Sequence, residues 1–335
     1  MKHPTMADYV EIICTLFDKF EQYQREQASR KLGKPYTYSE KVLLIFFLVM
    51  QFRRIFKFKA QRRWLEKHPD LRKMLGFNSI PHRTTLSRRY KQMYDTVQDF
   101  VAFLGQYAKT LDEQFSQADL VEDKSLFKAL GSVWHQKDRA VEHIPDKLRN
   151  LDTDATWSKS GYQGWVYGYG LHLTCNLDAF PQLVVVTTAA TSETDILDQK
   201  ESFILDIIQP RTLSADNGYT QALRIRRWFK RGVTLLTPAK KWIKGRFAVA
   251  YHRLIKQPSF APCLKRRRTS VEPLFDLIAK VLGTTGRHKQ LPVQRLDNVK
   301  TCLAVATLSV QIAMISNNIW SLPARNVSDI HSAFT

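Results

Sequence analysis

Apolar residues recur every three or four positions through the first third of the chain, which predicts helices. One such face is formed by Val10, Ile13, Phe17 and Phe20. Ser39 is placed to cap a further helix. Short helices are expected at 62–67 and 71–75, with Gly76 ending the second, and a basic helix over 83–104. This order is compatible with a helix-turn-helix DNA reader, and equally with a helical bundle that has a basic outer face.

The pattern changes near residue 118, where strand-like segments begin. A short strand is expected from residue 120 to Asp123, and further strands over 165–174, 182–188, 211–215 and 233–237. Helices are expected from Ser192 or Thr194, and over 221–230, 269–282 and 298–315. A hairpin followed by βαβ units predicts a mixed α/β sheet with helices packed on it. Polar residues within the apolar segment 298–315 favour core packing over membrane crossing.

Composition narrows the class of protein. The 335 residues include 44% hydrophobic residues and only 13 Gly and 13 Pro, which excludes a disordered or collagen-like chain. The length suggests two domains, or one large domain with an appendage. The four cysteines are scattered without a CxxC pair, which argues against a disulfide scaffold and fits a reducing compartment. The longest apolar run, 42–50, is shorter than the ~20 residues of a membrane span, so we expect a soluble cytoplasmic protein.

Positive charge is concentrated in one segment. The chain has 51 Lys and Arg against 31 Asp and Glu, a formal charge of +20. The segment 217–271, between Asp216 and Glu272, holds no acidic residue but 15 Lys or Arg, interleaved with aromatic residues. Such a segment is either a solvated basic face or a surface that a polyanion compensates. Its length and single sign favour nucleic-acid binding with a steep salt dependence.

Three acidic residues stand out by position. Asp123 follows a predicted strand, Asp216 ends another, and Glu272 lies one turn into a predicted helix. Such positions can converge at one edge of an α/β sheet, where ligands bind. Carboxylate oxygens suit Mg²⁺ or Mn²⁺, and two such ions can activate the attacking oxygen and stabilise the leaving oxygen in phosphoryl transfer.

Each acid also has a structural interpretation. Asp123 can be a solvated strand end, with Asp119 or Glu122 as the relevant acid instead. Asp216 can shape the turn that Asn217 and Gly218 favour. Glu272 can close a capping box with Thr269. The apolar stripe of its helix leaves Glu272 on the opposite face, which favours a functional role.

Several motifs in order resemble the catalytic domain of bacterial DDE transposases from insertion sequences. They are VEDKSLFKALGSVWH around Asp123, DTDATWSKS from Asp152, GWVYGYGLH from Gly164, SADNGY around Asp216 and RTSVEPLF around Glu272. The resemblance covers roughly residues 115–320. It implies a ribonuclease-H-like fold in which Asp123, Asp216 and Glu272 form the catalytic, metal-binding triad for Mg²⁺ or Mn²⁺, with two ions expected.

The resemblance also implies a domain order and DNA contacts. Residues 1–113 would be a helical domain that binds DNA ends, 114–320 the ribonuclease-H-like catalytic domain, and 321–335 a C-terminal tail. The expected DNA contacts are Lys265, Arg266, Arg267, Arg268 and Lys280, with Arg83, Arg88 and Arg89 in the helical domain. The spacing between Arg268 and Glu272 matches many relatives. Where those relatives carry Tyr and Lys, however, this chain has Lys265 and Ala279, and Lys280 comes one residue late.

The implied activity is transposition. Water would attack a phosphodiester at the end of the element, and the freed 3′-hydroxyl would then attack target DNA. The implied partners are double-stranded DNA with terminal inverted repeats, target DNA and a second protomer in a DNA-bound homodimer. Two alternatives remain open: a nuclease of the same fold without strand transfer, and a non-catalytic DNA-binding protein derived from a transposase.

Overall fold

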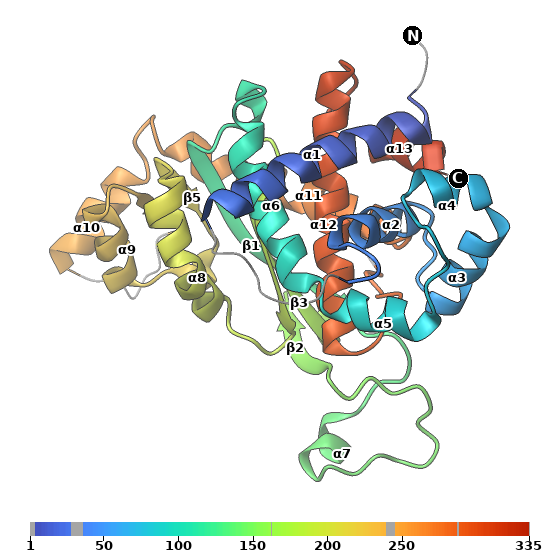
Figure 1. Ribbon diagram of the computed structural model, residues 1–335. Coiled ribbons are helices and arrows are strands. Elements are labelled where there is room, and N and C mark those ends of the chain that lie inside the picture. Colours follow the sequence, from blue (N-terminus) through green and yellow to red (C-terminus); the bar gives the residue numbers. More distant parts are fainter. Residues whose placement is uncertain (1–3, 28–35, 162, 239–244, 287, 335) are drawn as a thin grey trace. The chain divides into compact units, whose positions relative to one another are not determined.

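The computed structural model describes residues 4–27, 36–161, 163–238, 245–286 and 288–334 (Figure 1). The chain divides into two compact units. One consists of residues 105–276, and the other combines residues 1–104 with 277–335. The divisions fall inside two helices, α6 (Tyr94–Ala108) and α11 (Ala261–Val281). We call residues 105–276 the sheet unit, and residues 1–104 with 277–335 the helical unit.

The sheet unit is built on a mixed β-sheet. Its central strand, β1 (Asp119–Lys128), pairs antiparallel with β3 (Gly164–Asn176) and parallel with β5 (Thr212–Ser214). Outside these, β5 pairs parallel with β6 (Thr234–Leu236), while β3 pairs antiparallel with β4 (Pro181–Thr188) and with the short β2 (Thr156–Ser160). The order β4-β3-β1-β5-β6 places three antiparallel strands beside two parallel ones. The expected mixed sheet is thereby confirmed.

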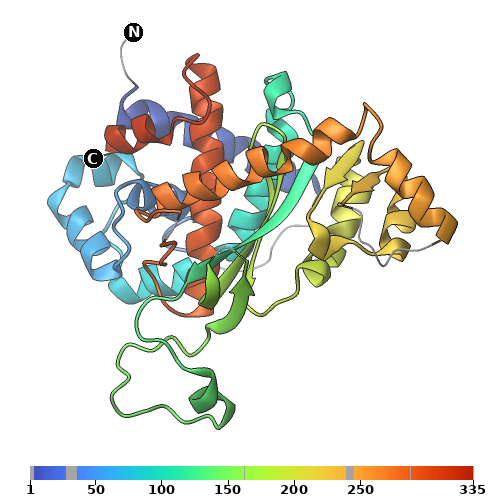
Figure 2. The same ribbon diagram turned by 180° about the vertical axis from the view of Figure 1, so that it is seen from behind.

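Helices follow the strands of this unit in turn. The unit contains α7 (Gln136–Ala140), α8 (Glu193–Ser202), α9 (Ala222–Lys230), α10 (Gly245–Leu254) and most of α11. Short turns of helix are η1 (Glu113–Phe115), η2 (Phe203–Ile208), which continues α8, and η3 (Asn217–Tyr219). Figure 2 shows α11, in orange, crossing the strands on the side that faces the viewer. The segment that carries α7 extends past the end of the sheet as an arm (Figure 1).

Close strand packing explains the glycine at position 168 of β3. The strand is buried from Val166 to Asn176, as expected for a strand with neighbours on both edges. At Gly168 a Cβ would overlap the backbone carbonyl of Phe127 on β1. Only glycine lets the two backbones approach this closely.

The helical unit surrounds one long apolar helix, α12 (Leu296–Ile319). Its other helices are α1 (Met6–Gln27), α2 (Glu40–Phe52), α3 (Phe58–Lys67), α4 (Pro69–Met74), α5 (Arg83–Lys91), α6 and α13 (Val327–Phe334). Helix α12 packs against α1, α2, α5 and α13. It is long and apolar enough to cross a membrane, but 94% of its most apolar window is buried inside the protein. This burial agrees with the predicted core helix.

Most elements lie where the hydrophobic pattern predicts them. Ser39 caps α2 and accepts a hydrogen bond from the Val42 amide at 3.2 Å. Gly76 follows α4 with a φ of 86°, the left-handed conformation that glycine favours. The single helix predicted over 83–104 is wrong. The amide of Met93 turns back to the Tyr90 carbonyl, and the chain forms two helices, α5 and α6.

Two elements near the candidate site are longer than predicted. Strand β1 continues to Lys128, so Asp123 lies within it and not at its end. Helix α11 begins at Ala261, not near Thr269, because the basic residues before Thr269 are themselves good helix formers. The capping box considered for Glu272 is therefore excluded. The Thr269 hydroxyl instead donates to the carbonyl of Arg266 inside the helix.

The compact units do not follow the linear domain boundaries expected from the sequence. Residues 277–320, expected with the catalytic domain, and 321–335, expected as a tail, are grouped with the N-terminal helices. The predicted tail forms α13, where the Phe334 ring stacks on Phe52 at 4.9 Å. Burial of these apolar faces draws the two ends of the chain into one unit.

Candidate active site and basic surfaces

Asp123 lies on the central strand of the sheet unit and is held by two contacts. Its Oδ2 accepts from Nη1 of Arg267 at 2.8 Å, and its Oδ1 accepts from the backbone amide of Lys124 at 2.8 Å. Burial raises the pKa of Asp123 to about 7, although Arg267 acts in the opposite direction, and the charges of Asp216 and Glu193 raise this pKa further. Asp123 is thus a partly buried carboxylate whose ionised form is disfavoured by burial and by other negative charges nearby.

Asp216 and Glu193 face the same point beside the sheet. Asp216 follows β5 and caps η3, where its Oδ1 accepts from the Gly218 amide at 2.6 Å. Glu193 is the first residue of α8. A Cβ placed on Gly218 would lie 2.8 Å from Oε2 of Glu193 and 2.9 Å from Oδ1 of Asp216. The two carboxylates therefore approach each other across a position that glycine leaves empty.

The three carboxylates influence one another electrostatically. Burial raises the pKa of Glu193, and the charge of Asp216 raises it further, while Lys124 lowers it. Asp123 and Asp216 come from the neighbouring parallel strands β1 and β5, as expected for acids that meet at one sheet edge. We call Asp123, Asp216 and Glu193 the carboxylate cluster.

Glu272 is not part of this cluster. It is exposed on α11, five residues after Arg267, which is about 140° around the helix. No hydrogen bond or ion pair joins it to Asp123 or Asp216 in the described ranges. Among the described residues, no three His, Cys, Asp or Glu side chains lie close enough to hold a metal ion as they stand.

The carboxylate cluster nevertheless fits a divalent cation in its chemistry. Its oxygens are the hard ligands that Mg²⁺ and Mn²⁺ prefer. The Arg267 guanidinium on Asp123 shows that this carboxylate accepts a cationic partner. A dication at this place would offset the repulsion that raises the pKa values of Asp123 and Glu193.

The four basic residues before Glu272 have different environments. Arg267 pairs with Asp123, and Arg266 pairs with Asp178 at 2.9 Å and donates to the Leu177 carbonyl. Lys265 and Arg268 are exposed on α11. Lys280 is also exposed, near the end of the same helix. Arg266 is exposed as well but is engaged by Asp178, so Lys265 and Arg268 are the members that face solvent on the same side of the helix as Glu272.

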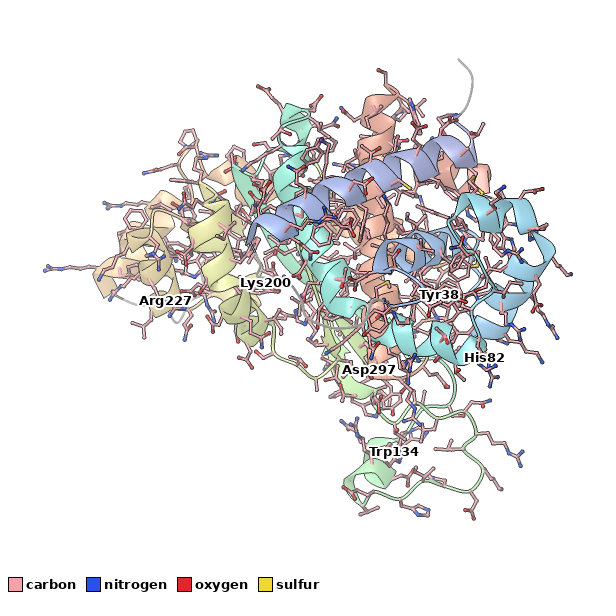
Figure 3. The ribbon with its side chains drawn as sticks, viewed as in Figure 1. Tyr38, His82, Trp134, Lys200, Arg227 and Asp297 are labelled. Atoms are coloured by element: carbon pink, nitrogen blue, oxygen red, sulfur yellow. The ribbon has the colours of Figure 1, made fainter. Side chains whose placement is uncertain are left out.

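Part of the charge in the acid-free segment is paired with acidic residues within the sheet unit. Three of its arginines pair with acids of α8 and η2, in the pairs Arg224–Asp198, Arg227–Glu201 and Arg231–Asp206. Figure 3 labels Arg227 of α9 and Lys200 of α8. Acids that lie earlier in the sequence therefore compensate part of this segment, a contribution that the sequence analysis did not predict.

Two of the interleaved aromatic residues are core residues. The Trp228 ring is buried, and its Nε1 donates to Glu201 at 2.9 Å. The Tyr251 ring is also buried, with its hydroxyl at the carbonyl of Leu235. The remainder of the predicted basic stretch includes Lys240, Lys241, Trp242 and Lys244, which lie outside the described residues.

A basic groove lies between α3 and α5 of the helical unit. It encloses about 800 Å³ and is lined by the basic residues Lys57, Lys59, Arg83, Arg88 and Lys91, together with Phe58, Thr84, Ser87 and Gln92. No acidic residue is among its lining residues. Two of the predicted DNA contacts in this unit, Arg83 and Arg88, line the groove.

The third, Arg89, has a different environment. Arg89 is buried, and its guanidinium carbon lies 3.8 Å from the centroid of the Tyr36 ring. A buried cation stacked on a ring contributes to packing. Arg89 therefore does not line the groove with Arg83 and Arg88.

The comparisons with known proteins agree with the motifs. Residues 134–289 match the family model of the transposase DDE domain. The match supports the resemblance to DDE transposases over these residues, which are a little under half of the chain. Asp216 and Glu272 lie within the matched residues, and Asp123 lies before them.

Comparison with solved structures adds one distant similarity. The Mos1 transposase paired-end complex with left transposon end has 11% sequence identity, with 80% of this chain and 86% of that chain covered, and a TM-score of 0.22. At this score the similarity carries no argument about this chain. The search of curated proteins gives no match.

Sequence reasoning missed Glu193. The sequence does give an indication of it. Glu193 lies where a predicted helix begins after a predicted strand, and Asp123 and Asp216 were selected because they follow predicted strands. The residue was passed over because no quoted motif of the family contains it.

Proposed function

We propose that the protein is a DNA transposase that cuts phosphodiester bonds at the ends of an insertion sequence and joins the freed 3′-hydroxyl to target DNA. The observation that carries this proposal is the approach of Asp123 and Asp216, which come from neighbouring strands of the mixed sheet. It is supported by the match of residues 134–289 to the transposase DDE domain. Two Mg²⁺ or Mn²⁺ ions, held by Asp123, Asp216 and Glu272, would activate the attacking oxygen and stabilise the leaving oxygen.

The protein side chains position the DNA in this proposal. Lys265 and Arg268 are exposed on the same side of α11 as Glu272, where they can bind phosphates beside the scissile bond. Arg267 lies against Asp123 and keeps that carboxylate neutralised in the absence of a cation. Because both cleavage and joining use oxygen nucleophiles from water and DNA, the reaction needs no Ser, Tyr or Cys nucleophile.

The helical unit supplies a surface for the DNA ends. The basic groove lined by Arg83 and Arg88 supports the proposal that residues before 113 bind the terminal inverted repeats. Its phosphate contacts would make binding strongly salt-dependent. The DNA-bound form is proposed to be a homodimer, since joining two ends of one element brings two active sites together. The protein would act in the cytoplasm, at the nucleoid.

The decisive experiment compares wild type, Asp123→Asn and Glu272→Gln on DNA that carries the element's ends. Both variants should bind the DNA as wild type does and lose cleavage with Mg²⁺ or Mn²⁺. Asp119→Asn is the matched control, because Asp119 lies on the same strand but pairs with Arg211. Normal cleavage by Asp123→Asn would refute the catalytic assignment.

Pre-cut ends separate the alternatives. A transposase joins a pre-cut 3′-end to target DNA, whereas a nuclease of the same fold hydrolyses DNA without joining it. Metal-independent DNA binding without cleavage by the wild type would instead identify a transposase-derived DNA-binding protein.

A further inference from the structure

Glu193 is aimed at the carboxylate cluster by the local fold. Two hydrogen bonds from Nζ of Lys124 to the carbonyls of Ala189 and Thr191 hold the loop between β4 and α8, at 2.9 Å and 2.8 Å. Two turns further along α8, Lys200 is fixed to Glu122 of β1. The start of α8 is therefore tied to the strand that carries Asp123, and Glu193 is the residue at that start.

The position of Glu193 has an electrostatic cost that Lys124 and Arg267 offset only in part. Its Oε2 and the Oδ1 of Asp216 both lie within 3 Å of the point where a Cβ of Gly218 would be. Two carboxylates that face the same point repel each other when both are ionised. A helix N-terminus favours an acidic residue in general, but it does not require that residue to face a second carboxylate.

An unpartnered hydroxyl beside the cluster gives a second, independent observation. Tyr219 is completely buried, and its hydroxyl has no hydrogen-bond partner among the residues that the structure describes. Burial raises the pKa of Tyr219, and the charges of Glu122, Glu193, Asp123 and Asp216 raise it further, so this hydroxyl lies between the Glu122 carboxylate and the cluster. A buried hydroxyl without a partner is costly, and the missing partner of such a group is commonly a water or an ion.

We propose that Glu193 is a ligand of the divalent cation, bound jointly with Asp216 next to Asp123, and that the Tyr219 hydroxyl hydrogen-bonds to a water on that cation. The proposal deepens the proposed function and rests on it, because it assigns a further residue to the same cation site. It adds a third carboxylate of the sheet unit to the site, beside Asp123 and Asp216. Glu272, exposed on α11, then remains available for a cation that enters with the DNA.

Cation binding without DNA tests this assignment directly. Mn²⁺ binding to the full chain is measured by isothermal titration calorimetry and by electron paramagnetic resonance of free Mn²⁺. Glu193→Gln and Gly218→Ala should each weaken Mn²⁺ binding by about tenfold or more, the second because its methyl group occupies the space between the two carboxylates. Tyr219→Phe should weaken binding less, since it removes only a contact to a bound water.

Asp195→Asn is the matched control. Asp195 is exposed in the same first turn of α8, so it has the same relation to the helix N-terminus but does not face the cluster. It should bind Mn²⁺ as wild type does. Thermal unfolding without metal should leave Glu193→Gln at least as stable as wild type, because the substitution removes repulsion. A clear loss of metal-free stability would show a structural role and overturn the proposal.

The outcomes for this proposal and for the proposed function differ. If Asp123→Asn and Asp216→Asn lose Mn²⁺ binding while Glu193→Gln keeps it, the Glu193 assignment is refuted and the transposase proposal is not. If wild type binds Mn²⁺ through Glu193 but neither cuts nor joins DNA, the cation site stands and the transposase proposal fails. If wild type binds no Mn²⁺ without DNA, the Glu193 assignment is refuted.

Discussion

Lys200 and Glu122 form an ion pair that is almost completely removed from water. Nζ of Lys200 lies 2.8 Å from Oε1 of Glu122, and the two side chains are 4% and 0% exposed. The Thr174 hydroxyl also donates to the Glu122 carboxylate, at 2.5 Å. Burial raises the pKa of Glu122 and lowers that of Lys200, although pairing acts in the opposite direction on both. Desolvation therefore outweighs attraction at this site.

The expected cost of breaking the pair follows from that balance. Glu122→Gln leaves the Lys200 ammonium buried without a counter-charge, which should lower the free energy of unfolding by about 3–5 kcal/mol. This is a large part of the ~5–15 kcal/mol that stabilises a typical domain. The triple variant Glu122→Leu, Thr174→Val, Lys200→Met replaces the whole group by apolar residues. It removes both charges, and it also removes the Thr174 hydroxyl, which would otherwise lose its partner Glu122. The triple variant should lie within about 1 kcal/mol of wild type or be more stable.

Urea unfolding at pH 7, followed by tryptophan fluorescence and circular dichroism, measures both effects. Coincident transitions by the two probes are needed before free energies are compared. The reasoning would be refuted if Glu122→Gln cost less than about 1 kcal/mol, the range of exposed pairs. It would also fail if the triple variant were as unstable as the single one, because the pair would then contribute net stability.

Three further predictions concern other parts of the chain. Arg88→Ala should weaken DNA binding and lower the slope of log binding constant against log salt concentration by about 1. Arg89→Ala should instead lower thermal stability without changing that slope. Gel shifts at several salt concentrations and thermal melts distinguish the two. Because the folded protein raises the pKa of Asp123 from 3.8 to about 7, it holds this proton more tightly than the unfolded chain does. Metal-free stability should therefore fall as pH rises through this range, and in Asp123→Asn urea unfolding at pH 5 and pH 8 should no longer show that contribution. Gly168→Ala should destabilise the sheet by about 2 kcal/mol or more, since its methyl group meets the carbonyl of Phe127; unchanged urea unfolding would contradict this.

Local patterns predicted the elements but not their partners. Alternation and apolar runs located β3 and β4, because a strand buried on both faces has few polar residues. The length of β1 was missed because Glu122 and Lys124 are charged, and their partners, Lys200 and two loop carbonyls, lie more than 60 residues away. The pairing of the α9 arginines with α8 is equally non-local. A count of charges along the sequence therefore overestimated the free positive surface.

The candidate site was predicted in part for the same reason. Asp123 and Asp216 follow from strand positions and from the resemblance to DDE transposases. The place of Glu193 depends on how α8 returns onto β1, and the position of Glu272 depends on a helix that begins eight residues before Thr269. Neither follows from local spacing.

The helical unit is discontinuous in the chain, and this affects how it can form during synthesis. Helices α1 to α6 leave the ribosome first, yet α12, against which α1, α2 and α5 pack, is made only after the sheet unit is complete. At about 5–20 residues per second, the early helices wait on the order of ten seconds or more for that partner. Throughout this interval the apolar face of α2 is uncovered, so newly made chains should depend on chaperones more than the finished fold suggests.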